Sequence, residues 1–299
     1  MTVAALSQQD VSVSTPAVRR RPNWRAVGLL TPAGLLLLVL GACAVAVLRI
    51  SFGLKNAEWD AWTLANYQAL ADASQFRIFL KTIVLAFASA VAAAVCAFPI
   101  AVYMTRTASA TMRRLVLICV MLPMLISLLV QSYGWIAILG PEGLLNRMLA
   151  LITGSQRATS FLFNDTGVLL GLIQTSLPLA VLPIVSALAT VPRVLEEAAS
   201  VLGASRLTVY REIILPMIWP GVVTGALLVF AFNTGAFAVP LLLGGLRVTT
   251  VAMLIRDQMG VMLDWPLGGA LSVALVVLVM AVLMTRRVLV GTARRTSRG

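Results

Sequence analysis

The chain has 299 residues, of which 60% are hydrophobic and 11% are charged, and its mean hydropathy is +0.96. Soluble domains carry about a quarter charged residues, so this composition excludes an ordinary soluble core. The 23 Lys and Arg against 11 Asp and Glu give a net charge of +12. The absence of histidine excludes His-based catalytic triads, zincin-type metal sites and His proton relays.

Six stretches of the chain contain no Asp, Glu, Lys or Arg and are long enough to cross a bilayer, which takes roughly 20 apolar residues. They are Ala26–Leu48, Thr82–Thr105, Leu115–Pro141, Thr166–Pro192, Ile213–Leu246 and Trp265–Thr285. The sequence therefore predicts an all-α, polytopic membrane protein with six transmembrane helices. A nucleic-acid partner is not expected, because a basic patch that binds nucleic acid needs a polar surface.

The basic residues predict the orientation of these spans. With six spans, the tails 1–25 and 286–299 lie on the same face as the loops 106–114 and 193–212. That face holds 15 Lys and Arg against four acids, and the opposite face holds eight against seven. Because cytoplasmic loops are enriched in Lys and Arg, we expect both tails on the cytoplasmic side of a six-span domain at 26–285.

The segments between the spans carry weaker signals. Trp59, Trp62 and Tyr67 predict that the first outer loop, 50–78, lies along the membrane surface. Leu144, Leu145, Met148 and Ile152 recur at helical spacing and predict a short amphipathic helix in the second outer loop. The fifth apolar stretch is too long for one upright helix, and its Phe232–Gly235 segment followed by Pro240 predicts a break.

The loop 193–212 differs from the other loops. Leu195, Ala198, Ala199 and Leu202 are spaced to form one face of a short helix. Pro192 suits the first turn of such a helix, and the acids Glu196 and Glu197 are favoured there by the helix dipole. We expect Gly203 to end this helix and Ser205 to cap the next one, which continues into the fifth span and bends at Pro216. A thin helix with acids in its first turn is better suited to docking a protein than to lying on lipid headgroups.

The motif in this loop resembles one found in bacterial ABC-importer permeases. Glu197-Ala198-Ala199, Gly203, Ile213, Leu215 and Pro216 match the pattern EAA---G---------I-LP. Further segments are similar to the spermidine/putrescine-type subfamily; they are Trp62–Tyr67, Leu122-Pro123, Gln131–Trp135, Gly143–Asn146, Gly235–Phe237, Leu243–Gly245 and Trp265–Gly268. The resemblance covers about residues 25–285. It departs at Gln131, where polyamine-type members more often carry arginine.

The resemblance implies a type I ABC importer permease fold in a bacterial inner membrane. The loop would be a coupling helix seated in a separate ATPase, with docking contacts at Leu195, Glu197, Ala198, Ala199, Leu202, Gly203 and Pro216. The implied partners are two ATPase subunits, a second homologous permease, a periplasmic substrate-binding protein and membrane lipid. The chain has no phosphate-binding Gly-x-x-x-x-Gly-Lys-Ser/Thr segment, so we expect no enzyme activity and no cofactor bound by this chain, with ATP and magnesium used by the partner ATPase.

A solute pathway can be sought from the depth of polar residues in the spans. Gln131, Gln174 and Asn233 lie roughly 24, 27 and 30 Å above the inner ends of their spans, so they share one level. Tyr133, Trp135, Thr175 and Phe232 lie beside them, and we expect the seven residues to line the pathway. Interhelical hydrogen bonding between subunits is the alternative role for the three amides.

The expected solute is small and polar, with a polyamine as the leading candidate. No Asp or Glu lies inside a predicted span, so either the second permease supplies acids or the solute is not strongly cationic. Relatives carry amino-acid conjugates, opines, γ-aminobutyrate-like zwitterions or phosphonates. Gly221 and Gly225 on the fifth span either pack against the second permease or form a chance pair.

Two other classes of protein compete with this interpretation. An ion-coupled secondary transporter would normally place an ionisable residue near the midplane of the membrane, and the predicted spans have none. A non-transporting membrane assembly protein would leave the loop motif and the layer of amides unexplained.

Overall fold

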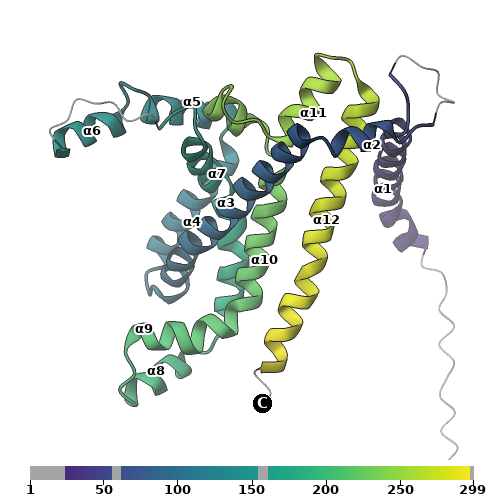
Figure 1. Ribbon diagram of the computed structural model, residues 1–299. Coiled ribbons are helices and arrows are strands. Elements are labelled where there is room, and N and C mark those ends of the chain that lie inside the picture. Colours follow the sequence, from purple (N-terminus) through teal and green to yellow (C-terminus); the bar gives the residue numbers. More distant parts are fainter. Residues whose placement is uncertain (1–23, 56–61, 154–160, 297–299) are drawn as a thin grey trace, which may run out of the picture. The chain divides into compact units, whose positions relative to one another are not determined.

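The computed structural model describes residues 24–55, 62–153 and 161–296, and the regular elements of this part of the chain are all helical (Figure 1). The α-helices are α1 (Trp24–Ser51), α2 (Ala65–Leu70), α3 (Ala73–Arg106), α4 (Ala110–Leu125), α5 (Leu128–Leu139), α6 (Leu144–Thr153), α7 (Asp165–Ala189), α8 (Arg193–Val201), α9 (Arg206–Thr208), α10 (Leu215–Thr234), α11 (Val251–Gly260) and α12 (Trp265–Thr296). Two π-helical segments, η1 (Val209–Ile214) and η2 (Pro240–Gly244), complete the series.

Six helical segments are long and apolar enough to cross a membrane, which confirms the predicted number of spans. They are Thr31–Ser51, Ala73–Arg106, Leu128–Ile152, Asp165–Ala189, Arg206–Thr234 and Trp265–Thr285. The described residues up to Ala46 form one compact unit, and those from Val47 onward form a second unit that contains the packed helices. The tail segment 1–23 and Trp59 lie outside the described residues.

The prediction of one continuous third span over Leu115–Pro141 is wrong. The structure ends α4 at Leu125 and begins α5 at Leu128, with Ile126 and Ser127 in extended backbone conformations between them. The side chain of Gln131 stabilises this break, because its Nε2 donates to the carbonyl oxygens of Pro123 and Ile126. The Gln131 side chain thus donates hydrogen bonds to carbonyl groups that have no backbone partner because the helix ends there.

Helices α3, α7 and α10 form the centre of the second unit (Figure 1). The face of α3 that packs inward consists of small residues at helical spacing, including Ala86, Ala90, Ala93, Ala97 and Ala101, and all five are buried. Small residues bring helix backbones close together, which increases van der Waals contact where lipid removes the hydrophobic driving force.

Gly221 and Gly225 of α10 pack within the chain, against α7. A Cβ added at Gly221 would clash with the Ala187 side chain, and one added at Gly225 would lie 2.9 Å from the Ala180 carbonyl oxygen. This glycine pair therefore supports an intrachain helix contact, so a contact with a second permease is not needed to explain it.

Several features that the sequence predicts between the spans fall within the described residues, and the position of the first outer loop along the membrane surface stays a prediction. The helix over 144–152 is present as α6, but it lies within the candidate span Leu128–Ile152 rather than in a loop between spans. Trp62 and Tyr67 pack against Phe52, with ring centroids 5.8 and 5.1 Å apart, and the Tyr67 hydroxyl lies 2.7 Å from Ser51 Oγ. The break after the fifth span is also confirmed, because α10 ends at Thr234 and η2 begins at Pro240. Helix α11, which packs against α12, was not predicted.

Candidate functional site

The loop that carries the motif folds as a short helix followed by a tight turn, as predicted. Helix α8 begins after Pro192 and ends at Val201, and Gly203 adopts a φ of +80°, a conformation that favours glycine. Ser205 caps α9, because its hydroxyl accepts a hydrogen bond from the backbone N–H of Thr208 at 3.2 Å. The chain then continues through η1 into α10, and Pro216 lies in the first turn of that helix.

Helix α8 turns one face into the protein and leaves the opposite face exposed. Ala199 is only 8% exposed and belongs to the same apolar core as Val209 and Ile214. Val194 and Val201 are 67% and 87% exposed, and Glu197 and Ala198 lie exposed between them. These four residues, spaced i, i+3, i+4 and i+7, form one stripe, which we call the α8 outer face.

The predicted docking residues are divided between these environments. Glu197 and Ala198 belong to the α8 outer face, whereas the side chain of Ala199 is directed into the chain. Leu195 and Leu202 are exposed on the flank of the helix, and Gly203 has open space around its Cα. Val194 and Val201 were missed, because apolar residues occur on nearly every side of this helix and several adjacent faces fit a helical period.

Two contacts connect α8 to the end of α3. The guanidinium of Arg106 forms an ion pair with the carboxylate of Glu196. In the opposite direction, Nη2 of Arg193 donates to the backbone carbonyl of Thr105 at 3.0 Å. About 90 residues of sequence separate the partners of each contact, so no local pattern could have predicted them.

Of the predicted solute-pathway residues, Asn233 is held by two neighbouring helices. Its Nδ2 donates to Ser89 Oγ of α3 at 2.7 Å and to Ser176 Oγ of α7 at 3.1 Å. The Asn233 side chain is buried, and its Oδ1 has no hydrogen-bond partner among the described residues. Gln131, whose amide closes the break between α4 and α5, is also buried. Both side chains thus have hydrogen-bond partners within this chain, and their place in the solute pathway stays a prediction.

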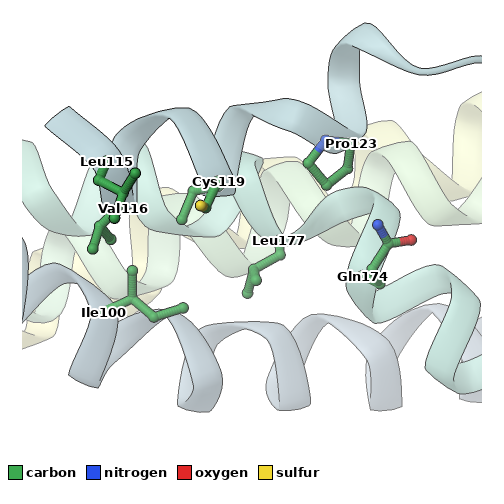
Figure 2. Close-up of a pocket in the computed structure, with 8 residues that line it drawn as sticks. Ile100, Leu115, Val116, Cys119, Pro123, Gln174 and Leu177 are labelled. Atoms are coloured by element: carbon green, nitrogen blue, oxygen red, sulfur yellow. The ribbon is translucent and has the colours of Figure 1, made fainter.

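Gln174 lies in a different position, at one end of an open groove of about 390 Å³ between α3, α4 and α7 (Figure 2). The groove is lined by Ile100, Leu115, Val116, Cys119, Val120, Pro123, Gln174 and Leu177. Gln174 Oε1 accepts a hydrogen bond from Trp135 Nε1 at 3.3 Å. Gln174 is the one predicted pathway residue in this groove, whose remaining lining presents no charged group to a polar solute.

The last three predicted residues do not converge on one cavity either. The Thr175 hydroxyl is buried and donates to the Gly171 carbonyl at 2.9 Å. The rings of Tyr133 and Phe232 are exposed on the surface of this single chain. Within the described residues, no group of three or more His, Cys, Asp or Glu side chains is placed to hold a metal ion.

Six apolar helices long enough to cross a membrane, together with the exposed, motif-bearing helix α8, define a polytopic membrane transport subunit. Residues 89–290 match the family described as the binding-protein-dependent transport system inner membrane component, and the chain belongs to this family of ABC-importer permeases. It is thus a multi-pass inner membrane protein and a transporter subunit rather than an enzyme.

Curated relatives place the chain near the polyamine-type permeases. It is 31% identical over 216 residues to the spermidine/putrescine transport system permease protein PotB of Escherichia coli (strain K12), covering 72% of this chain and 78% of that protein. It is also 31% identical over 228 residues to the inner membrane ABC transporter permease protein YdcU of the same organism, covering 73% and 72% of the two chains.

Solved structures share the fold at low sequence identity. A bacterial ABC transporter involved in the import of the acidic polysaccharide alginate matches with a TM-score of 0.73 at 18% identity, covering 91% of this chain and 96% of that one. The MetNI methionine ABC transporter in an inward-facing conformation matches with a TM-score of 0.55 at 19% identity, covering 73% and 95%. These similarities confirm the expected importer permease fold.

Proposed function

We propose that this chain is one permease subunit of an ATP-driven importer in which the α8 outer face docks on a separate ATPase. The exposed stripe of Val194, Glu197, Ala198 and Val201 is the observation that carries the proposal. Exposed apolar residues around the Glu197 carboxylate favour binding in a groove of another protein, because such a groove covers the apolar surface and can supply a partner for the carboxylate. Leu195, Leu202 and Gly203 would form the edge of the contact, and Ala199 would support it from within.

The complete transporter would contain two ATPase subunits, a second homologous permease and a periplasmic binding protein that delivers the solute. ATP and magnesium would be used by the ATPases. Closure of the ATPases would move α8 and convert the spans from an inward-facing to an outward-facing arrangement. The charge bias of the loops supports a cytoplasmic location for α8 and for both tails.

The proposed solute is a small polar amine, with spermidine or putrescine as the first candidates because of the similarity to PotB. Gln174 and Trp135 offer an amide and an indole ring beside the groove. They supply no carboxylate, so the second permease would have to neutralise a polyamine. A 2-aminoethylphosphonate is the next candidate, since a shorter segment of the chain is 32% identical to the putative permease PhnU of Salmonella typhimurium.

Reconstitution of the complete transporter in proteoliposomes tests this proposal. ATP hydrolysis is measured with the binding protein alone and after adding spermidine, putrescine, γ-aminobutyrate or 2-aminoethylphosphonate. We expect stimulation by one of these solutes and its loss in Glu197→Gln and Ala198→Asp. Stimulation that survives Ala198→Asp would contradict docking on the α8 outer face, and stimulation by none of the amines would contradict the solute class.

A further inference from the structure

The two adjacent glutamates of α8 have different surroundings. Glu197 lies on the α8 outer face and is exposed. Glu196 is turned the other way, and its side chain is only 21% exposed because it lies against Arg106 at the end of α3. The two carboxylates therefore cannot serve the same partner, although they are neighbours in the sequence.

The contacts between α3 and α8 are reciprocal. Arg106 of α3 forms the ion pair with Glu196 of α8, and its side chain is only 16% exposed. Arg193 of α8 donates to the carbonyl of Thr105 at 3.0 Å and to that of Arg106 at 3.5 Å. Each helix thus contributes one arginine, and we call this set of contacts the α3–α8 strap.

The positions of these charges on their helices reinforce the strap. The last carbonyl groups of α3 have no intrahelical hydrogen-bond partners and carry partial negative charge. The Arg193 guanidinium donates to two of these carbonyls and places a positive charge beside them. Glu196 lies in the first turn of α8, where the positive end of the helix dipole favours an acid. Partial burial reduces the screening of the Arg106–Glu196 pair by salt relative to a fully exposed pair.

Helix α3 connects the strap to the interior of the bundle. Ser89 lies 17 residues before Arg106 on this helix, a distance of about 26 Å. Its hydroxyl accepts from Asn233 of α10, which also bonds to Ser176 of α7. A displacement of α8 can therefore reach these three central helices through α3, in addition to the direct path through η1 into α10.

We infer that Glu196 is a positioning residue that acts through Arg106, so that α8 and α3 move as one unit during transport. This inference rests on the proposed docking of an ATPase at α8. The two glutamates then have different functions. Glu197 engages the ATPase, whereas Glu196 passes the motion to α3. A carboxylate used only for docking would not need a partly buried arginine beside it at the end of α3.

Spin-label distances in the intact transporter test the strap directly. The native Cys43, Cys96 and Cys119 are first replaced by serine. Spin labels are then attached to the variants Tyr103→Cys, on α3, and Ser200→Cys, on the flank of α8, because both positions are exposed. The label-to-label distance is measured without nucleotide and after trapping with ATP and vanadate. Co-purification of the ATPase is recorded for every variant.

We expect a narrow distance distribution that ATP and vanadate leave unchanged. Glu196→Gln should broaden it while retaining the ATPase. Glu197→Gln, the matched control, should keep the narrow distribution and lower ATPase co-purification at least about fivefold. A narrow distribution in Glu196→Gln would overturn the strap, whereas retention of the ATPase by Glu197→Gln would contradict only the docking face.

Discussion

Asn233 Nδ2 lies 2.7 Å from Ser89 Oγ, and this hydrogen bond joins residues of α10 and α3 that are 144 positions apart in the sequence. The same nitrogen lies 3.1 Å from Ser176 Oγ of α7, so one buried amide links the three central helices. In an apolar bundle each such bond also fixes the rotation of the helices that it joins, because the polar groups have no water as an alternative partner.

Replacing Asn233 with alanine should therefore destabilise the folded bundle. We expect a loss of about 1 kcal/mol in the free energy of unfolding, as for other hydrogen bonds between membrane helices. The free energy of unfolding is measured in mixed micelles of detergent and SDS. Phe232→Ala is the control, and it should be nearly as stable as the original chain because the Phe232 ring is exposed. Unchanged stability in Asn233→Ala together with weaker solute uptake would instead place Asn233 in the solute pathway.

Gly225 should be intolerant of a side chain even when the chain is produced alone. A Cβ at this position would lie 2.9 Å from the Ala180 carbonyl oxygen and 3.1 Å from its Cα, so α7 and α10 would have to separate. Gly225→Leu should lower the thermal stability of the isolated chain, whereas Gly134→Leu, at a position with open space, should not. If Gly225→Leu leaves the isolated chain stable and only prevents assembly with a second permease, the intrachain contact is not its role.

Gln131 should contribute to stability through the break between α4 and α5. Gln131→Leu removes the donor to the Pro123 and Ile126 carbonyls, and the loss of a hydrogen bond costs about 1 kcal/mol of stability. Hydrogen exchange of the backbone amides in 124–135 should accelerate in this variant. The comparison variant is Tyr133→Leu, whose ring is exposed, and faster exchange in both variants would argue against a specific role for the Gln131 amide.

The turn after α8 permits a test that separates backbone conformation from charge. Gly203 has a φ of +80°, which asparagine and aspartate adopt more readily than other residues, and nothing lies within 4 Å of a Cβ placed there. Gly203→Asn should therefore retain stimulated ATP hydrolysis, whereas Gly203→Asp should lose it while still inserting in the membrane. Equal activity of the two variants would show that this turn does not approach the ATPase.

The conformation of the loop 193–212 could be predicted closely from the sequence because its signals are local. Gly203, Ser205 and the spacing of Leu195 to Leu202 predict a helix, a turn and a second helix, and all three are present. Which face of α8 is buried could not be predicted, since that depends on Val209 and Ile214 beneath Ala199. The same reason applies to Asn233 and Gln131, whose partners are set by helix packing and by a break inside an apolar run.

Photocrosslinking at α8 in the assembled transporter decides whether this helix docks on the ATPase. A photoreactive phenylalanine derivative is placed at Ala198, on the α8 outer face, and Leu246, which is fully exposed in the segment between η2 and α11, provides the comparison position. We expect an adduct between this chain and the ATPase from Ala198 and none from Leu246. The absence of an ATPase adduct from Ala198, in complexes that contain the ATPase, would contradict this docking.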